Sequence, residues 1–193
     1  MPNTGANLYL VGFMGTGKTT IGRAVAHRLG YDLLDSDHEI EREIGGSIRA
    51  FFEQHGEPAF RDLEQQTLAT LVQQTGAVLA TGGGAVLRDA NRQALKRHCE
   101  VVYLRSAPEE LFRRLRHDTQ RPLLQVKDPL KRLRDLYQER DALYRDAADF
   151  VIETGRPSVP TLVNMILMQL ELAGVIDPAR VPATVGRVLP PSG

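Results

Sequence analysis

The sequence predicts an α/β fold in which helices cover both faces of a parallel sheet of five strands. Short apolar runs alternate along the chain with longer segments whose apolar residues recur at helical spacing. That alternation is typical of parallel sheets. Polar or glycine-rich motifs follow three of the apolar runs, and ligands bind beyond the carboxyl ends of the strands in such sheets.

The expected strands are short and mostly apolar, and the expected helices have apolar residues three and four positions apart. The strands span Asn7–Val11, Asp32–Asp35, Ala77–Ala80, Glu100–Leu104 and Phe150–Glu153. The helices span Thr19–Leu29, His38–Ile44, Ile48–His55, Pro58–Gln74, Asp89–Arg97, Ala107–Leu115, Pro129–Tyr144 and Val159–Ala173.

Residues at the segment ends support several of these boundaries. Gly30 ends the first helix, and Gly45-Gly46 separates two short ones. Ser106 is expected to cap the helix that follows it, because Pro108 falls in the first turn and Glu109 lies three residues after the serine.

The chain is long enough for about one domain, which is expected over residues 1–175. Residues 116–126 show no clear period and are interpreted as a loop. Residues 176–193 are rich in Pro, Gly, Ala and Val, so they are expected to form a poorly ordered tail.

Composition argues against several classes of protein. The chain has 24 Lys plus Arg and 24 Asp plus Glu, whereas a nucleic-acid-binding protein usually carries a basic excess. No apolar run approaches the ~20 residues of a membrane span, and the N-terminus has no signal-peptide pattern. Cys99 is the single cysteine and is expected to be structural. A cytoplasmic monomer without nucleic-acid or membrane partners is therefore expected.

A phosphate-binding loop follows the first expected strand. Gly12-Phe13-Met14-Gly15-Thr16-Gly17-Lys18-Thr19 matches G-x-x-x-x-G-K-[ST], in which glycines let successive backbone N–H groups point at phosphate oxygens. Lys18 supplies a charge to the terminal phosphates, the Thr19 hydroxyl can bind Mg²⁺, and the following helix directs its positive dipole end at the same anion. A nucleoside triphosphate is the expected ligand.

The loop alone does not separate a GTPase, an ATPase and a kinase. The N-K-x-D signature of guanine binding is absent. Motor and transporter ATPases need a larger chain than 193 residues. A small-molecule kinase therefore fits best.

Asp35-Ser36-Asp37 ends the second expected strand, where two carboxylates can face the phosphate loop. One or both could reach Mg²⁺ through water, and one could accept a proton from an attacking hydroxyl. Asp37 could equally cap the helix that follows it.

Two motifs could contact an acidic acceptor. Arg61 can bind a carboxylate with two parallel hydrogen bonds, although spacing alone favours a solvent-exposed pair with Asp62 or Glu64. Gly82, Gly83 and Gly84 follow the third expected strand and leave bare backbone against which a ligand can press.

Two further arginines lie later in the chain. Arg121-Pro122-Leu123-Leu124 falls in the aperiodic stretch, where a flexible loop carrying Arg can close over a nucleotide. Arg140 could face the site or pair in solvent with Glu139 or Asp141.

Together these motifs resemble the shikimate kinase family over about residues 7–173. The residues that carry the resemblance are Gly12–Thr19, Asp35-Ser36-Asp37, Gly56-Glu57, Phe60-Arg61, Glu64, Gly82–Gly84, Arg121–Leu124, Arg140, Leu143-Tyr144 and Ala148-Asp149. The resemblance implies a three-layer P-loop kinase fold with strand order 2-3-1-4-5, a lid at about residues 112–126 and an acceptor-binding region at about residues 35–64. It also implies transfer of the ATP γ-phosphoryl group, with Mg²⁺, to the 3-hydroxyl of shikimate, a step toward chorismate and the aromatic amino acids.

The resemblance further implies a role for each site residue. The catalytic residues would be Lys18, Asp37 as the base, and Arg121 on the lid. ATP would be bound by Gly15, Thr16, Gly17, Lys18, Thr19, Thr20, Arg114, Arg121 and Arg156. Shikimate would be bound by Asp37, Arg61, Gly82, Gly83, Gly84 and Arg140. Mg²⁺ would be held by Thr19 and Asp35.

Two alternatives stay open at the level of sequence. One is a kinase of another small acceptor, such as gluconate, which the phosphate loop permits but the arginine and glycine set disfavours. The other is a nucleotide-binding module that has lost catalysis, which the intact Lys18, Thr19, Asp37 and Arg121 disfavour.

Overall fold

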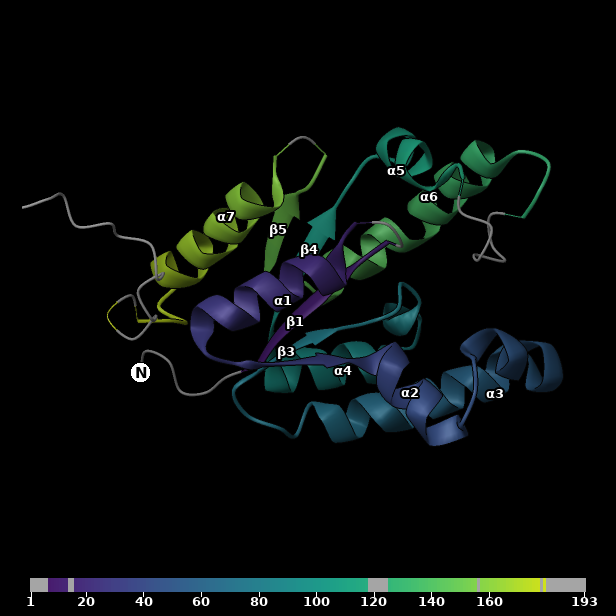
Figure 1. Ribbon diagram of the computed structural model, residues 1–193, viewed down its shortest axis with the longest axis horizontal. Coiled ribbons are helices and arrows are strands. Elements are labelled where there is room, and N and C mark those ends of the chain that lie inside the picture. The colour runs from purple at the N-terminus through teal and green to yellow at the C-terminus, as the bar shows by residue number, and fades with distance from the viewer. Residues whose placement is uncertain (1–6, 14–15, 118–124, 156, 178, 180–193) are drawn as a thin grey trace, which may run out of the picture.

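The computed structural model describes residues 7–13, 16–117, 125–155, 157–177 and 179 (Figure 1). Its centre is a parallel sheet in the order β2-β3-β1-β4-β5, which confirms the predicted order. Each expected strand is present, and two are longer than expected by one or two residues. The strands are β1 (Asn7–Gly12), β2 (Asp32–Asp35), β3 (Ala77–Ala80), β4 (Cys99–Arg105) and β5 (Phe150–Glu153).

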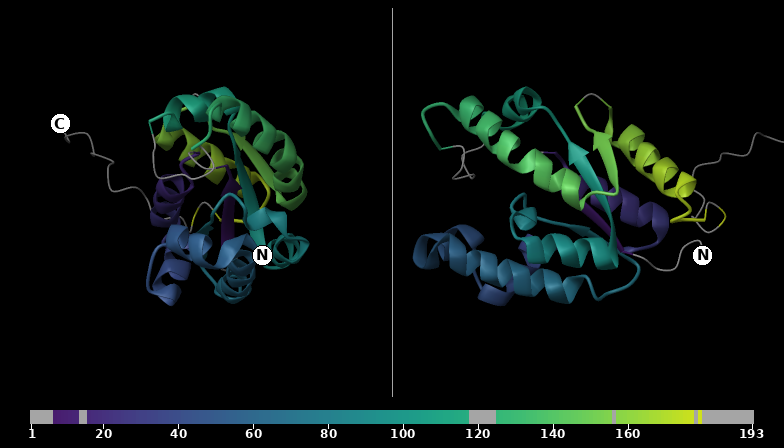
Figure 2. Two further views of the ribbon diagram at one scale, coloured as in Figure 1. Left: turned by 90° about the vertical axis from the view of Figure 1, so that its right-hand side faces the viewer. Right: turned by 180° about the vertical axis from the view of Figure 1, so that it is seen from behind.

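Helices connect the strands and cover both faces of the sheet (Figures 1 and 2). They are α1 (Lys18–Leu29), α2 (Ser36–Ile44), α3 (Ile48–Leu71), the short 3-10 helix η1 (Ala85–Leu87), α4 (Asp89–His98), α5 (Pro108–Leu115), α6 (Pro129–Ala147) and α7 (Val159–Leu172). No helix in the described part of the chain is long and apolar enough to cross a membrane.

Two hydrophobic cores lie on opposite faces of the sheet, because side chains alternate along a strand. Leu8 and Leu10 of β1 pack into one core with α1 and α7. Tyr9 and Val11 of β1 pack into the other core with α3, α4, α5 and α6. The middle strand is therefore buried on both sides, which explains its continuous apolar sequence. The molecule has the predicted three layers.

The prediction of two separate helices over Ile48–His55 and Pro58–Gln74 was nearly right. The structure joins them as α3, but Gly56 inside it has φ 82° and ψ 172°, which is far from helical. Pro58 lies two residues later. The break is where the sequence indicates it, and the two halves meet there without an intervening loop.

The prediction that Ser106 caps the next helix was wrong. Ala107 is the N-cap of α5, with φ −63° and ψ 147°, and no side chain caps the helix. The residue before a proline is restricted to extended conformations, so Pro108 forces the boundary onto Ala107. Ser106 is buried, and its hydroxyl has no partner in the described part of the chain.

Two predicted regions lie wholly or partly outside the described residues. The expected lid at 112–126 is described at its two ends only, and Arg121 is outside. Of the expected tail at 176–193, only residues 176, 177 and 179 are described.

Candidate active site

The predicted site residues gather at one edge of the sheet, because the carboxyl ends of parallel strands meet there. β1 ends at Gly12 and leads through the phosphate loop into α1. β2 ends at Asp35, and β3 ends one residue before Thr81 and the three glycines. Segments far apart in the sequence therefore meet around one point.

The phosphate loop closes around the side chain of Lys18. The Lys18 ammonium donates to the carbonyl oxygens of Gly12 and Phe13, with N–O distances of 2.8 Å to each. The buried Thr16 hydroxyl also donates to the Phe13 carbonyl at 2.8 Å. Gly12 has φ 149°, and a Cβ at this position would lie 2.5 Å from the Leu104 carbonyl oxygen, so a larger residue does not fit.

Asp35 links the first turns of two helices. Its Oδ2 accepts a hydrogen bond from the Thr19 hydroxyl of α1 at 3.1 Å. Its Oδ1 accepts from the backbone N–H groups of Asp37 at 3.0 Å and His38 at 3.3 Å, which makes Asp35 the N-cap of α2. The alternative that Asp37 caps this helix was wrong, because the helix begins at Ser36, two residues earlier than expected. The Asp37 carboxylate is thereby available for another role.

The Thr19–Asp35 pair fits the ligand chemistry of Mg²⁺. Mg²⁺ prefers oxygen ligands, and proteins usually hold it with one or two carboxylates together with substrate phosphates. The described part of the chain contains no cluster of three or more His, Cys, Asp or Glu residues that could hold a metal. A site that shares its ion with phosphate needs no such cluster.

Asp37 faces the glycine segment after β3. A Cβ placed on Gly82 would lie 3.0 Å from Oδ1 and 3.2 Å from Oδ2 of Asp37. Burial and the neighbouring Asp35 raise the pKa of Asp37 to about 6, and Lys18 opposes the shift. Its Oδ1 atom is buried without a hydrogen-bond partner in the described residues. Asp37 is thus a carboxylate with a spare acceptor atom.

Arg61 lies in the second half of α3, just after the break at Gly56. Its Nη1 donates to Oε1 of Glu64 at 2.9 Å, and its Nε and Nη2 lie 3.3 Å from Glu57. Glu64 is only 1% exposed, and burial raises its pKa while Arg61 lowers it. A Cβ on Gly84 would collide with the Arg61 guanidinium. Arg61 therefore pairs with Glu64 and also lies against the glycine segment.

Arg140 faces the site and not the solvent. It is 6% exposed, its guanidinium carbon lies 5.6 Å from the ring centre of Phe13, and its Nε has no partner in the described residues. Its Nη1 would lie 3.5 Å from a Cβ on Gly83. The neighbouring Asp141 pairs instead with Arg105 and Arg145.

The three glycines after β3 each contact a different predicted residue. Gly82 lies against Asp37, Gly83 against Arg140, and Gly84 against Arg61. We refer to Gly82–Gly84 as the glycine wall. The structure thus brings the four acceptor-side segments together, although they lie more than 100 residues apart at the extremes.

The remaining predicted nucleotide-binding residues are less completely described. Thr20 is exposed in the first turn of α1. Arg114 donates through Nη2 to the Thr154 carbonyl oxygen at 3.0 Å. Gly15, Arg121 and Arg156 lie outside the described residues.

Two residues of this site had no functional role in the sequence-based prediction, which named both for the resemblance and otherwise considered Glu64 only as an exposed partner of Arg61. Glu64 holds Arg61, and the spacing of three residues on one helix was a signal for it. Tyr144 donates its hydroxyl to the Gly83 carbonyl oxygen at 2.6 Å. No local pattern could have found this contact, because 61 residues separate the two groups.

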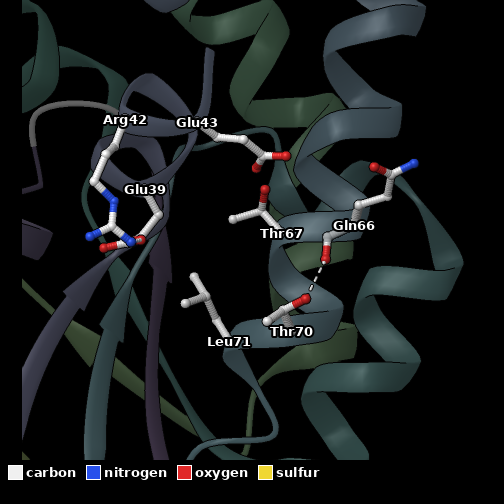
Figure 3. Close-up of a pocket in the computed structure, with 7 residues that line it drawn as sticks. All are labelled: Glu39, Arg42, Glu43, Gln66, Thr67, Thr70 and Leu71. Atoms are coloured by element: carbon white, nitrogen blue, oxygen red, sulfur yellow. Dashed lines mark hydrogen bonds and ion pairs between the residues drawn. The ribbon is translucent and has the colours of Figure 1, made fainter. Parts of the chain in front are cut away.

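A second cleft, of about 480 Å³, lies between α2 and α3 (Figure 3). It is lined by Glu39, Arg42, Glu43, Gln66, Thr67, Thr70 and Leu71. None of the predicted site residues lines it, so it is not part of the candidate active site.

Comparisons with known proteins agree with this geometry. The family model described as "Shikimate kinase" matches residues 14–171. A shikimate kinase from Burkholderia lata is 61% identical over 171 residues, which cover 89% of this chain and 93% of the relative. A solved structure of shikimate kinase from Acinetobacter baumannii in complex with shikimate is 47% identical with a TM-score of 0.84, covering 89% of this chain and 96% of that one. A gluconokinase structure from Sinorhizobium meliloti is 18% identical with a TM-score of 0.57, covers 88% of this chain and 93% of that one, and shares the fold alone.

Proposed function

This chain belongs to the shikimate kinase family, and from that premise we propose how its residues divide the ATP-dependent phosphorylation of shikimate. The roles are assigned from one observation, which is that two sets of residues lie side by side. A phosphate loop and a glycine wall flanked by a carboxylate and two arginines meet at one edge of the sheet. The first element suits ATP, and the second suits a small acidic alcohol.

On the ATP side, we propose that the phosphate loop binds the β- and γ-phosphates. Lys18 exchanges its two carbonyl partners for phosphate oxygens, and the N-terminus of α1 adds its dipole. The contact of Lys18 with the loop supports this role, since the ammonium is already at the loop. Arg121 and Arg156 keep the roles that the sequence predicts for them, with Arg121 stabilising the charge on the transferred group.

Thr19 and Asp35 would hold Mg²⁺. Their oxygen atoms lie 3.1 Å apart, which supports a shared ligand. When bound, the ion neutralises charge on the phosphates and so favours attack by an oxygen nucleophile. Asp35 keeps its other oxygen on the backbone of α2, so the carboxylate is held at a fixed angle.

On the acceptor side, Arg61 and Arg140 bind the shikimate carboxylate. A planar carboxylate matches the forked guanidinium group. Arg140 is buried and the Arg61 side chain is only 13% exposed, which supports this role because desolvation strengthens charged hydrogen bonds. The bare backbone of the wall allows the ring of the acceptor to approach closely.

Asp37 receives the proton of the reacting hydroxyl. The 3-hydroxyl oxygen forms a bond to the γ-phosphorus, its proton passes to Asp37, and the bond between the γ-phosphorus and the bridging oxygen breaks to release ADP. A buried Oδ1 supports this role, since it is an acceptor without a hydrogen-bond partner among the described residues.

A direct assay tests the function. Purified protein with Mg²⁺-ATP is expected to release ADP when shikimate is added, and to give little ADP with gluconate or with no acceptor. Folded protein that binds ATP and yet turns over gluconate in preference to shikimate would refute the assignment.

We also infer that the working unit is a cytoplasmic monomer. One chain supplies both the phosphate loop and the acceptor residues, which supports a monomer. A buried thiol at Cys99, with its pKa raised to about 12 by burial, is consistent with a reducing compartment. Light scattering during size-exclusion chromatography tests the first statement.

A further inference from the structure

Tyr144 contacts the glycine wall through its hydroxyl group. It lies near the end of α6, is 1% exposed, and donates its hydroxyl to the Gly83 carbonyl oxygen at 2.6 Å. This oxygen belongs to the middle residue of the wall. The hydroxyl thus ties α6 to the one segment that contacts Asp37, Arg140 and Arg61.

Aromatic neighbours hold the Tyr144 ring on two sides. The ring stacks on Tyr103 of β4, with ring centres 4.9 Å apart, and meets Phe13 of the phosphate loop edge to face at 6.4 Å. The Tyr103 hydroxyl has a different partner from that of Tyr144, because it donates to Asp141 at 2.7 Å. Packing between the rings therefore fixes the position of the Tyr144 ring.

Arg140 and Tyr144 act on the same glycine. They are four residues apart on α6 and so lie on one face of the helix. A Cβ on Gly83 would lie 3.3 Å from the Tyr144 oxygen and 3.5 Å from Nη1 of Arg140. Burial raises the pKa of Tyr144 to about 12, although Arg140 opposes the shift. The hydroxyl consequently stays protonated and remains a donor at neutral pH.

We infer that Tyr144 is a positioning residue for the acceptor, and that its hydroxyl holds the glycine wall in the conformation that binds shikimate. The inference rests on the proposed function. Three successive glycines have more conformational freedom than any other tripeptide. Loss of the donor to this partly buried carbonyl is costly, so the wall would adopt other conformations to satisfy it. The hydrogen bond that joins Tyr144 to Gly83 belongs to the hydroxyl, whereas the contact with Phe13 of the phosphate loop belongs to the ring.

The test compares two tyrosine-to-phenylalanine variants. Y144F removes the hydroxyl that contacts the wall and keeps the ring, whereas the control Y103F removes the hydroxyl of the stacked ring, which donates to Asp141 and not to the wall. Steady-state kinetics give kcat and KM for both substrates, and calorimetry well below the melting temperature gives the Kd for shikimate. We expect Y144F to raise the KM and Kd for shikimate about tenfold, equal to about 1.4 kcal/mol. We expect kcat and the KM for ATP of Y144F to change less than about twofold. In Y103F, kcat, both KM values and the Kd for shikimate should all change less than about twofold.

Two results would overturn the inference while leaving the proposed function intact. One is a Y144F variant with wild-type KM and Kd for shikimate. The other is an equal rise in KM for ATP and shikimate, which indicates a general structural role. Wild-type protein that shows no turnover of shikimate would overturn the proposed function and this inference together. Melting curves of each variant show whether Y144F is folded, and Y144H, which keeps a donor on a smaller ring, should restore part of the affinity.

Discussion

Asp37 is a single residue whose charge is unfavourable to the fold that contains it. Burial and the neighbouring Asp35 raise the pKa of its carboxyl group to about 6 from the ordinary value of 3.8. A carboxylate with a higher pKa in the folded than in the unfolded state destabilises the fold at pH values where it is charged. The residue proposed as the proton acceptor thus lowers the stability of the folded protein.

Replacing Asp37 should therefore stabilise the protein. Between about pH 4 and pH 6 the folded state binds more protons than the unfolded state, so stability falls as the pH rises through that window. At pH 7, D37N is expected to increase the free energy of unfolding by ~1–2 kcal/mol, after allowance for solvent screening, while phosphoryl transfer is lost. Urea unfolding without nucleotide or divalent ion measures this.

The pH dependence supplies the internal control for that prediction. At pH 4 the wild-type carboxyl is already protonated, so the gain in D37N should largely disappear. D62N, at an exposed carboxylate that pairs with Arg88, should show no gain at either pH. A gain of equal size at pH 4 and pH 7 would contradict the explanation.

Substitution of Arg61 should affect the KM for shikimate and the KM for ATP differently. R61A is expected to raise the KM for shikimate on the order of 100-fold, because it removes a buried charged donor, and to leave the KM for ATP nearly unchanged. R61K keeps the charge but loses the fork, so it should fall between R61A and wild type. R49A is a suitable control, because Arg49 pairs with Glu53 on the exposed surface of the same helix.

Initial-rate kinetics with each substrate varied in turn measure these constants. Loss of the Arg61 guanidinium also leaves Glu64 buried without its partner, so R61A should melt at a lower temperature. An equal rise in both KM values would show that Arg61 has no selective role toward the acceptor.

At the scale of elements, the break in α3 places Arg61. The helix changes direction at Gly56, whose φ of 82° and ψ of 172° are almost unavailable to other residues. The second half, which carries Arg61 and Glu64, packs against the sheet through Leu68 and Leu71. A straight helix could not give both halves their present directions.

G56A should consequently destabilise the fold. An alanine at this φ and ψ costs ~1–3 kcal/mol, although the nearest atom to a new Cβ is 3.8 Å away, so the cost is conformational and not steric. Thermal unfolding measures it, and a fall in melting temperature is expected. G46A is the matched control, because Gly46 has no positive φ and no atom within 4 Å of a new Cβ. Equal melting of both variants would count against a strained Gly56.

Most elements of this fold could be predicted from the sequence, because hydrophobic periodicity decides them locally. The errors arose where a tertiary or backbone constraint overrode a local pattern. Ser106 had the spacing of a capping residue, but the proline two residues later moved the cap. Asp37 was a good candidate for a cap, but the helix begins two residues earlier than expected, and Asp35 accepts from its first N–H groups.

The sequence predicted which residues gather at the candidate site better than it predicted how they are arranged. Spacing alone favoured an exposed pair for Arg61, and the pair exists, but Glu64 is buried because α3 packs against the sheet. The orientation of Arg140 depends on the position of α6 over Phe13. Such facts follow from packing between distant segments, which one sequence does not reveal.

At the scale of the whole molecule, the candidate site joins the two hydrophobic cores. The phosphate loop leads into α1, which belongs to the core on one face of the sheet. Arg61 and Arg140 come from α3 and α6, which pack into the core on the other face. Ligands that contact both the phosphate loop and the two arginines should stabilise the folded state on both faces of the sheet.

Ligand binding should therefore be visible in global unfolding. Shikimate at about 100 times its Kd adds ~2.7 kcal/mol, which for a chain of this size raises the melting temperature by about 5 to 10 °C. R61A should lose most of this shift with shikimate and retain the shift with ATP. Scanning calorimetry at fixed ligand excess measures both, and a wild-type protein unmoved by shikimate would contradict the proposed acceptor.

The glycine wall also has a consequence for inheritance and selection. Three adjacent codons specify residues that contact three different side chains: a carboxylate, a guanidinium beside a tyrosine, and a second guanidinium. A missense change in any one of these three codons places a side chain against a different group of the proposed site. In a library of random variants under selection for growth, these codons should tolerate almost no amino-acid change, and each for its own reason.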